Sequence, residues 1–284
     1  MLGKIMKTVA VITSTIGRPH LERAILSVQQ QTYPCKHYVF VDGEQFAKDA
    51  KQILDKYPHV IAIYLPMNTG ANGWTNSSIN AIAPFLVKED VICYLDDDNW
   101  YEANHVENSS KVLNETGADY AFALRNLYDD QEEFVCQDLL ESIGNYENNL
   151  PNPYQFKITI NDKTYACQTE VHKKDGHIDT NCYLIKRDLA LRVSHFWYSG
   201  KNNDTNFYTI LKKVKAVGKC SKGFTVNYVM EPEKWDPGFF STVRTMDPNM
   251  PKPVMIKLFK EMFRMKMRQV MEINGGVYPW NRDE

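Results

Sequence analysis

Hydrophobic residues in the first part of the chain alternate between two spacings. Short apolar runs rich in β-branched residues predict four strands, at residues 8–14, 36–43, 60–66 and 91–98. Between them, apolar residues recur at the spacing of one helix face, which predicts helices at residues 20–32, 46–57 and 76–87. Strands that alternate with helices are joined by right-handed crossovers, so the pattern predicts an α/β fold with a mostly parallel sheet and helices on both faces.

The regular alternation ends near Tyr120, and the rest of the chain is more mixed. A hairpin is predicted within residues 148–168, turning at Asn161 and Asp162. The pattern then predicts a strand that runs into a helix at residues 177–193, a helix at 202–217 and a strand at 223–230. We expect three segments: residues 1–120, residues 121–245 of the same domain, and a helical tail at residues 246–284.

The predicted tail helix, residues 251–272, has two different faces. Its basic face carries Lys257, Lys260, Arg264 and Arg268, and its apolar face carries Met255, Leu258, Phe259, Met262 and Phe263. Such a helix either lies on an anionic membrane or packs its apolar face on the domain or on a second subunit. Lys266 interrupts the apolar face, which favours packing against protein.

The composition is that of an ordinary globular protein. A chain of 284 residues with 43% hydrophobic content can form one large α/β domain or two closely packed halves. The formal net charge of −2 provides no chain-wide basic field, which favours a small-molecule partner over nucleic acid. The six cysteines are scattered singly and match neither a disulfide framework nor a zinc site. Because no run of about 18 apolar residues occurs, we expect a cytoplasmic protein.

Polar residues follow each of the four predicted strands. They are Thr13, Ser14 and Thr15 after the first strand, Asp42 after the second, Asn68 and Gly70 after the third, and Asp96, Asp97 and Asp98 after the fourth. In open parallel sheets the ligand lies beyond the carboxyl ends of the strands. Any one of these residues alone is typical of a turn or a helix cap, but four polar strand ends together indicate a binding site.

Three consecutive carboxylates at a strand end repel one another unless a positive charge compensates them. In an extended chain Asp96 and Asp98 face one side, and Asp97 faces the other. Carboxylate oxygens are ligands that Mg²⁺ and Mn²⁺ prefer, commonly together with substrate phosphates. The triplet therefore predicts a site for Mn²⁺ or Mg²⁺ beside a diphosphate, with a solvated acidic loop as the alternative.

These stretches together resemble the GT-A glycosyltransferases, especially the family-2-like group that builds bacterial surface polysaccharides and lipooligosaccharides. The resemblance covers about the first 120 residues, and it implies that these form the nucleotide-sugar-binding half of one domain and that residues 121–245 form its acceptor-binding and catalytic half. It rests on "VAVITSTIGRPHLERAILSVQQQTYPCKHYVFVDG", "LPMNTGANG" and "YLDDDNWYEANHVE". The chain departs from the family at "GWTNSSIN", where members often have an Ala-Arg-Asn-like sequence.

The resemblance implies roles for the residues at the strand ends. The residues that would hold the nucleotide base are Thr13, Thr15, Arg18 and Asp42. The residues that would lie against the rest of the donor are Asn68, Gly70, Asp96 and Asp97. The metal would be held by Asp96 and chiefly by Asp98, with His177 or His195 as a further ligand. A lone histidine is also common as a hydrogen-bonded scaffold residue, and that alternative stays open.

In inverting members of the family, a carboxylate near the start of a late helix takes the proton of the acceptor hydroxyl. The best match here is Asp204, whose alternative role is to cap the helix that follows it. Asp179 and Thr180 fall where family members line the donor sugar and the acceptor. The candidate flat faces for a sugar ring are Trp197, Tyr198 and Trp235, with packing in the core as the alternative.

The implied activity is metal-dependent transfer of a sugar, with inversion, from a nucleotide-diphosphate donor to a hydroxyl of a glycan or lipid-linked acceptor. The expected donor is a UDP-hexose, and the expected cofactor is Mn²⁺ or Mg²⁺. Two alternatives stay open, a sugar-phosphate nucleotidyltransferase and a non-catalytic carbohydrate- or nucleotide-binding module. Peripheral contact with the inner membrane face through the tail helix, and a homo-oligomer, are also open.

Overall fold

The computed structural model describes residues 6–160, 162–169 and 176–282. The chain forms two compact units, each combining segments that are far apart in sequence. The first unit contains Met1–Arg125 and His177–Tyr228, and the second contains Asn126–Gly176 and Val229–Glu284. The expected division at residues 120 and 245 concerns the roles of the segments, and it stays a prediction.

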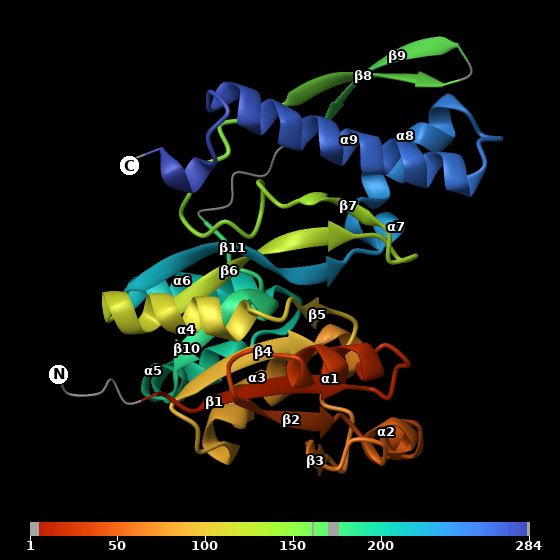
Figure 1. Cartoon of the computed structure of the whole chain (residues 1–284). Coiled ribbons are helices and arrows are strands. Elements are labelled where there is room, and N and C mark those ends of the chain that lie inside the picture. The colour runs from red at the N-terminus through yellow and green to blue at the C-terminus, as the bar shows by residue number, and fades with distance from the viewer. Residues whose placement is uncertain (1–5, 161, 170–175, 283–284) are drawn as a thin grey trace. The chain divides into compact units, whose positions relative to one another are not determined.

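The first unit is built on a mixed sheet with the strand order β3-β2-β1-β4-β10-β6-β11-β5. Its parallel strands are β1 (Val9–Thr15), β2 (Cys35–Val41), β3 (Ile61–Tyr64) and β4 (Val91–Asp96), which confirm the four predicted strands. Its antiparallel strands are β5 (Trp100–Tyr101), β6 (Tyr120–Tyr128), β10 (Tyr183–Lys186) and β11 (Gly218–Val229). The parallel part is thus continued by antiparallel strands, and two of these, β10 and β11, come from the later half of the sequence (Figure 1).

Six α-helices accompany this sheet in the part of the first unit that the structure describes. The three predicted between the first strands are confirmed as α1 (Leu21–Gln29), α2 (Ala47–Leu54) and α3 (Ser77–Leu86). The others are α4 (His105–Thr116), α5 (Arg187–Val193) and α6 (Asn203–Lys213). Buried side chains of α1, α2 and β2 form one apolar cluster, made of Leu21, Ile25, Val39, Val41, Ala50 and Leu54. Burial of this apolar surface holds both helices on the sheet.

Short 3-10 turns join several of these elements. In the first unit they are η1 (Glu44–Phe46), η2 (Ala71–Gly73), η3 (Thr180–Cys182), η4 (Ser194–Trp197) and η5 (Gly200–Asn202). The second unit has η6 (Pro279–Asn281). Turns η2, η3 and η5 contribute to the candidate site described below.

The register of the parallel strands places their carboxyl ends side by side. Ser14 of β1 is paired with Asp96 of β4, and Thr15 is paired with Val41, the residue before Asp42. The Asp42 amide donates a hydrogen bond of 2.8 Å to the Thr15 carbonyl, which extends this pairing beyond the strand. The polar residues that follow these strands therefore meet at one edge of the sheet, as predicted.

The second unit contains the predicted hairpin, β8 (Tyr154–Ile160) and β9 (Lys163–Thr169). Ile160 is paired with Lys163, so the connection has two residues. Asp162 has a φ of 62°, as two-residue hairpin loops commonly require, and Asn161 lies outside the described residues. The remaining elements of this unit are β7 (Phe134–Gln137), α7 (Pro232–Trp235), α8 (Pro237–Met246) and α9 (Lys252–Ile273).

Helix α9 is the predicted tail helix, and its apolar face is buried within the second unit. Met255, Phe259, Met262 and Phe263 are all buried, and Phe259 packs against the aromatic rings of α8. The prediction that this face packs against protein is therefore confirmed. Within the described part of the chain, no helix is both long and apolar enough to cross a bilayer.

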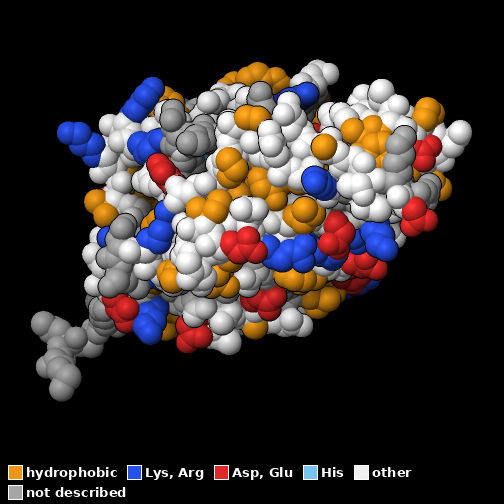
Figure 2. Space-filling model, turned by 90° about the horizontal axis from the view of Figure 1, so that it is seen from above, with side chains coloured by type: hydrophobic (Ala, Val, Ile, Leu, Met, Phe, Trp, Pro, Cys, Tyr) orange, Lys and Arg blue, Asp and Glu red, His pale blue; other side chains and the backbone are white. Residues whose placement is uncertain are grey.

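The basic side of α9 is also engaged within the unit. The Lys260 ammonium lies 2.6 Å from an Asp129 carboxylate oxygen and 2.7 Å from a Glu133 carboxylate oxygen. Arg264 pairs with Glu261 at 2.5 Å. Figure 2 shows basic and acidic side chains interspersed with hydrophobic ones on the face viewed from above. The charges of Lys260 and Arg264 are thus paired within the unit, and peripheral contact with a membrane stays a prediction.

Trp197 belongs to the core, which corrects its assignment as a face for a sugar ring. The side chain is fully buried. Its ring stacks on Phe207 with centroids 3.9 Å apart and meets the edge of Tyr94 at 5.2 Å. Neither face of the indole is left for a ligand.

Replacing Trp197 with alanine is expected to lower the free energy of unfolding by about 3–5 kcal/mol, because it leaves a large cavity. Urea unfolding followed by circular dichroism measures the change. Tyr198→Ala is the matched control, since Tyr198 is 59% exposed and its loss should cost much less. Equal, small effects of both substitutions would contradict the core assignment.

Candidate active site

Asp96, the last residue of β4, is held by two amide side chains. Its two carboxylate oxygens accept hydrogen bonds from Asn76 Nδ2 at 2.7 Å and from Asn181 Nδ2 at 2.9 Å. The Asp96 amide in turn donates to Asn181 Oδ1 at 2.7 Å. These contacts join three elements, because Asn76 precedes α3 and Asn181 lies in η3.

The other two acids of the triplet turn toward the loop after β1. Thr15 donates its hydroxyl hydrogen to Asp97 Oδ2 at 2.6 Å, and the Arg18 guanidinium lies 3.5 Å from Asp97 Oδ1. Arg18 also donates to Asp98 Oδ2 at 2.5 Å. Arg23 donates to the backbone carbonyl of Asp98 at 2.5 Å. Each of the three carboxylates thus has its own donors, which reduces the cost of placing like charges together.

Burial nevertheless disfavours the charged forms of two of these acids. Burial, followed by the charges of Asp98 and Asp179, raises the pKa of Asp96 to about 7. Burial also raises the pKa of Asp97 to about 6, although Arg18 and Thr15 favour its charged form. Burial thus favours the neutral forms of both acids, and a bound cation would favour their charged forms.

Asp42 organises the loop that follows β3. Its carboxylate accepts hydrogen bonds from the Thr69 amide at 2.8 Å, the Thr69 hydroxyl at 2.7 Å and the Gly70 amide at 2.8 Å. Asn68 Oδ1 accepts a further bond from the Gly70 amide at 3.0 Å. A Cβ on Gly70 would lie 2.3 Å from the Thr75 carbonyl oxygen, so only glycine fits here. The structure thus brings the predicted residues Asp42, Asn68 and Gly70 together.

The two threonines of β1 do not face a ligand with their side chains. Thr13 is fully buried, and its hydroxyl lies 2.9 Å from His37 Nε2. Thr15 is also buried, and its hydroxyl is engaged by Asp97 and by the Gly17 amide, at 2.6 and 2.9 Å. The expectation that their side chains hold a base is corrected: Thr13 is bonded to His37 on β2, and Thr15 positions the loop that carries Arg18.

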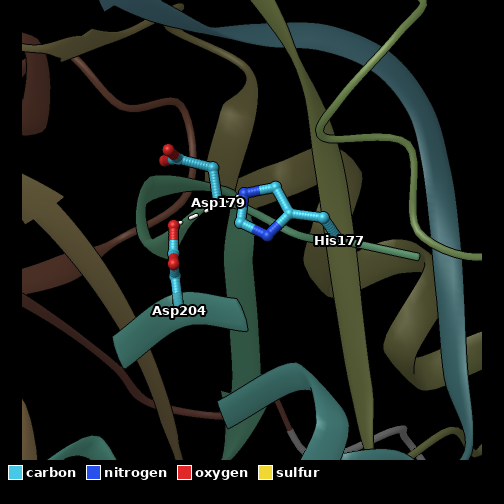
Figure 3. A group of neighbouring side chains, drawn as sticks. All are labelled: His177, Asp179 and Asp204. Carbon is cyan, nitrogen blue, oxygen red and sulfur yellow. Dashed lines mark ion pairs between the residues drawn. The ribbon is translucent and has the colours of Figure 1, made fainter. Parts of the chain in front are cut away.

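A second group of ligand-type side chains comes from the later part of the first unit (Figure 3). His177, Asp179 and Asp204 have ligand atoms that all lie within 4.8 Å of one another. His177 Nε2 is 3.4 Å from Asp204 Oδ2. Arg125 donates to Asp179 Oδ2 at 2.9 Å, and Asn181 Nδ2 donates to Asp179 Oδ1 at 2.8 Å. Thr180, between these partners, is buried in η3.

Asp204 is the second residue of α6, which begins at Asn203. Its Oδ1 accepts a hydrogen bond from the Thr205 amide at 2.6 Å, and its Oδ2 is the oxygen near His177. The side chain therefore contacts the first turn of the helix and also faces the group in Figure 3. The N-cap of α6 is Asn202, so the alternative that Asp204 caps the helix is wrong, and its role as general base stays a prediction.

The donor set suits a divalent cation that prefers oxygen. Asp96 and Asp98 offer carboxylates at one strand end, and the second group adds two carboxylates and one imidazole. His177 lies with Asp179 and Asp204, a group that does not include Asp98. Its assignment as a ligand alongside Asp96 and Asp98 stays a prediction. His195 is exposed and stacks on Phe196 with centroids 4.0 Å apart.

Sequence reasoning missed four residues that hold this site together: Asn76, Arg125, Asn181 and Asn203. Asn76 lies within "GWTNSSIN", the stretch that departs from the family pattern, and Asn181 follows Asp179 and Thr180 directly. Both residues therefore lie in stretches that the sequence already marked as part of the site. Arg125 lies inside β6, and its pairing with Asp179 across 54 residues has no signature in the sequence.

Residues 10–171 match the model of Glycosyl transferase family 2. The chain belongs to this family. Among solved structures it is similar to S. aureus TarS 1–349, with a TM-score of 0.54 and 12% identity over 88% of this chain and 68% of that one. For TarS 1–349 in complex with UDP-GlcNAc, the TM-score is 0.52, with 11% identity over 91% and 72% of the two chains. These likenesses confirm the expected GT-A fold.

A curated relative from Haemophilus influenzae, described as an uncharacterized protein, is 33% identical over 85 residues. The match covers 28% of this chain and 57% of the relative. The chain thus spans little more than half the length of this relative.

The raised pKa values predict how stability depends on pH in the presence of EDTA. Between about pH 4 and pH 7 the folded chain holds a proton on Asp96 that the unfolded chain has released, so this group's contribution to stability is lost as the pH rises. Asp96→Asn removes the penalty. The free energy of unfolding of the variant, relative to wild type, should therefore rise between pH 4 and pH 7.

Urea unfolding at several pH values measures this difference. Asp188→Asn, at an exposed position on α5, is the matched control and should keep the wild-type dependence. A difference between Asp96→Asn and wild type that stays constant with pH would contradict the prediction.

Proposed function

We propose that the protein is a metal-dependent glycosyltransferase that moves a sugar from a nucleotide-diphosphate donor to an acceptor hydroxyl. The observation that carries this proposal is the bridge made by Asn181. Its side-chain amide donates to Asp96, at the end of β4, and to Asp179, in the group that contains Asp204. One residue thus links the carboxylates suited to a donor with those suited to an acceptor.

UDP is the nucleotide that the proposal assigns to the donor. S. aureus TarS 1–349, which shares the fold, has been solved with UDP and with UDP-GlcNAc. In this chain, Asp42, Asn68 and Gly70 form a compact loop beside the strand ends, and Arg18 adds a half-exposed guanidinium. We assign the nucleotide to the loop and to Arg18.

Asp96 and Asp98 are the residues that we assign to Mn²⁺ or Mg²⁺. Such a cation would stabilise the negative charge that develops on a departing diphosphate. Burial and the neighbouring carboxylates raise the pKa of Asp96 to about 7, and a cation bound there would stabilise the charged form that burial disfavours, which supports this assignment. His177 is a further candidate ligand, with Asp179 and Asp204 in reach.

Asp204 is proposed to act as the general base. The acceptor oxygen forms a bond to the anomeric carbon, the bond from that carbon to the nucleoside diphosphate breaks, and the hydroxyl proton passes to Asp204. His177, 3.4 Å from Asp204 Oδ2, would orient that carboxylate. One displacement of this kind inverts the configuration. A glycan or lipid-linked acceptor follows from the family resemblance.

Binding of UDP is expected to require a divalent cation and Asp98. Calorimetric titration of UDP into the protein with Mn²⁺ should give binding that EDTA abolishes and that Asp98→Ala weakens at least about tenfold, since a charged ligand is lost. Asp188→Ala serves as the control for loss of an exposed carboxylate. Absence of UDP binding with either Mn²⁺ or Mg²⁺ would reject the donor assignment.

Asp204→Asn is expected to separate binding from turnover. The amide keeps the shape of the side chain but accepts no proton, so release of UDP from UDP-sugars should fall about 10²- to 10⁴-fold. UDP affinity should stay near the wild-type value, because Asp204 is assigned to the acceptor. Full turnover in the variant would exclude Asp204 as the base, whereas a wild-type protein that binds UDP-sugars without any turnover would favour a binding module.

A further inference from the structure

Two aromatic side chains stack on each other where two loops of the first unit meet. The rings of Trp74 and Tyr198 have centroids 4.5 Å apart and an interplanar angle of 23°. Trp74 directly follows η2, and Tyr198 directly follows η4. Tyr198 is 59% exposed. Trp74 covers one face of the phenol ring, so the opposite face is the one on which a ligand can stack.

Hydrogen bonds place this aromatic pair next to the acids of the active site. Asn203 Nδ2 donates to Asn76 Oδ1 at 2.7 Å, and Ser77 Oγ donates to the Gly200 carbonyl at 3.2 Å. Asn76 in turn donates to Asp96 at 2.7 Å. Trp74 is thus two residues from a partner of Asp96, and Asn203 immediately precedes Asp204.

The backbone that presents Trp74 is strained. Asn72 has a φ of 57° and Thr75 a φ of 52°, on either side of Gly73 and Trp74. A positive φ is rare for a β-branched residue such as threonine and persists only where the surrounding structure holds it. Here the Thr75 amide donates a hydrogen bond of 3.0 Å to the carbonyl of Gly70, which lies in the loop organised by Asp42. Strain of this kind concentrates at ligand sites, where it fixes a side chain in place.

A cation lies at the rim of the aromatic pair. The methylene groups of Lys201 run along Gly73, where an added Cβ would lie 2.5 Å from the lysine Cε. The side chain is exposed, and no acidic residue of the described ranges pairs with its ammonium. Gly73 therefore allows Lys201 to pass over the loop, and the charge at its end is available to a ligand.

We propose that Trp74, Tyr198 and Lys201 form an acceptor subsite for a pyranose ring that carries an anionic group. A sugar ring stacks its apolar face on the exposed side of Tyr198, which Trp74 supports from behind. The anionic substituent pairs with Lys201. This subsite rests on the proposed transferase function, since it places the acceptor beside Asp204.

The test compares two simple glycosides by ligand-observed NMR titration of the full chain in the presence of UDP and Mn²⁺. Methyl β-D-glucuronide should bind about two- to fivefold more tightly than methyl β-D-glucoside, as one exposed ion pair provides. Tyr198→Ala should weaken both roughly five- to tenfold through loss of the stacking surface. Lys201→Met should make the two affinities equal.

Matched controls come from exposed residues away from these loops. Tyr64→Ala, on β3, and Lys213→Met, at the end of α6, should leave both affinities unchanged. Unchanged binding in Tyr198→Ala, or no binding of either glycoside to wild type, would overturn the subsite. A loss of UDP affinity in Lys201→Met without a change for the glucuronide would assign the lysine to the donor diphosphate instead.

The same samples separate this subsite from the function on which it rests. Calorimetry reports UDP binding independently of the glycosides. If the glucuronide binds in a Tyr198-dependent manner but no nucleotide binds, the subsite is supported and the donor assignment is rejected. If UDP binds with Mn²⁺ but neither glycoside binds, the donor assignment is supported and the subsite is rejected.

Discussion

The candidate active site depends on one buried amide that holds two carboxylates near each other. Asn181 is fully buried, and its Nδ2 donates to Asp96 at 2.9 Å and to Asp179 at 2.8 Å. Its Oδ1 accepts a hydrogen bond of 2.7 Å from the Asp96 amide, so both the nitrogen and the oxygen of the side-chain amide are hydrogen-bonded. A neutral donor can serve two anions without a charge of its own, whereas an apolar residue there would leave both acids buried and short of donors.

The sheet explains why acids from distant parts of the chain meet at this amide. Strand β10, which follows Asn181 by two residues, pairs antiparallel with β4. The start of β10 therefore lies near the end of β4, and η3 faces Asp96. Arg125, near the end of β6 beside β10, reaches Asp179 at 2.9 Å and supplies the cation of the group. Antiparallel pairing of late strands thus completes a site that the parallel strands begin.

The parallel half was predictable because each of its strands is a continuous buried run that ends in polar residues. The pattern of β1 to β4 predicted the meeting of Asp42, Gly70 and Asp96, which follows from sheet geometry alone. Pattern could not show which side chains turn inward at a strand end, so Thr13 was misassigned. It also could not show that Arg125 pairs with Asp179, or that each unit combines two separate segments of the chain, because long-range pairing has no local period. The stacking of Trp197 in the core was likewise invisible to local sequence.

The departure from the family sequence at "GWTNSSIN" has a physical consequence at Asp96. An arginine from this stretch would favour the charged form of a neighbouring carboxylate and lower its pKa. The chain instead presents Asn76, which donates one hydrogen bond of 2.7 Å and carries no charge. Burial and the charges of Asp98 and Asp179 then keep the pKa of Asp96 at about 7. With a neutral partner, the charged form of Asp96 is stabilised only when a cation from outside the chain binds, which is the role proposed for Mn²⁺ or Mg²⁺.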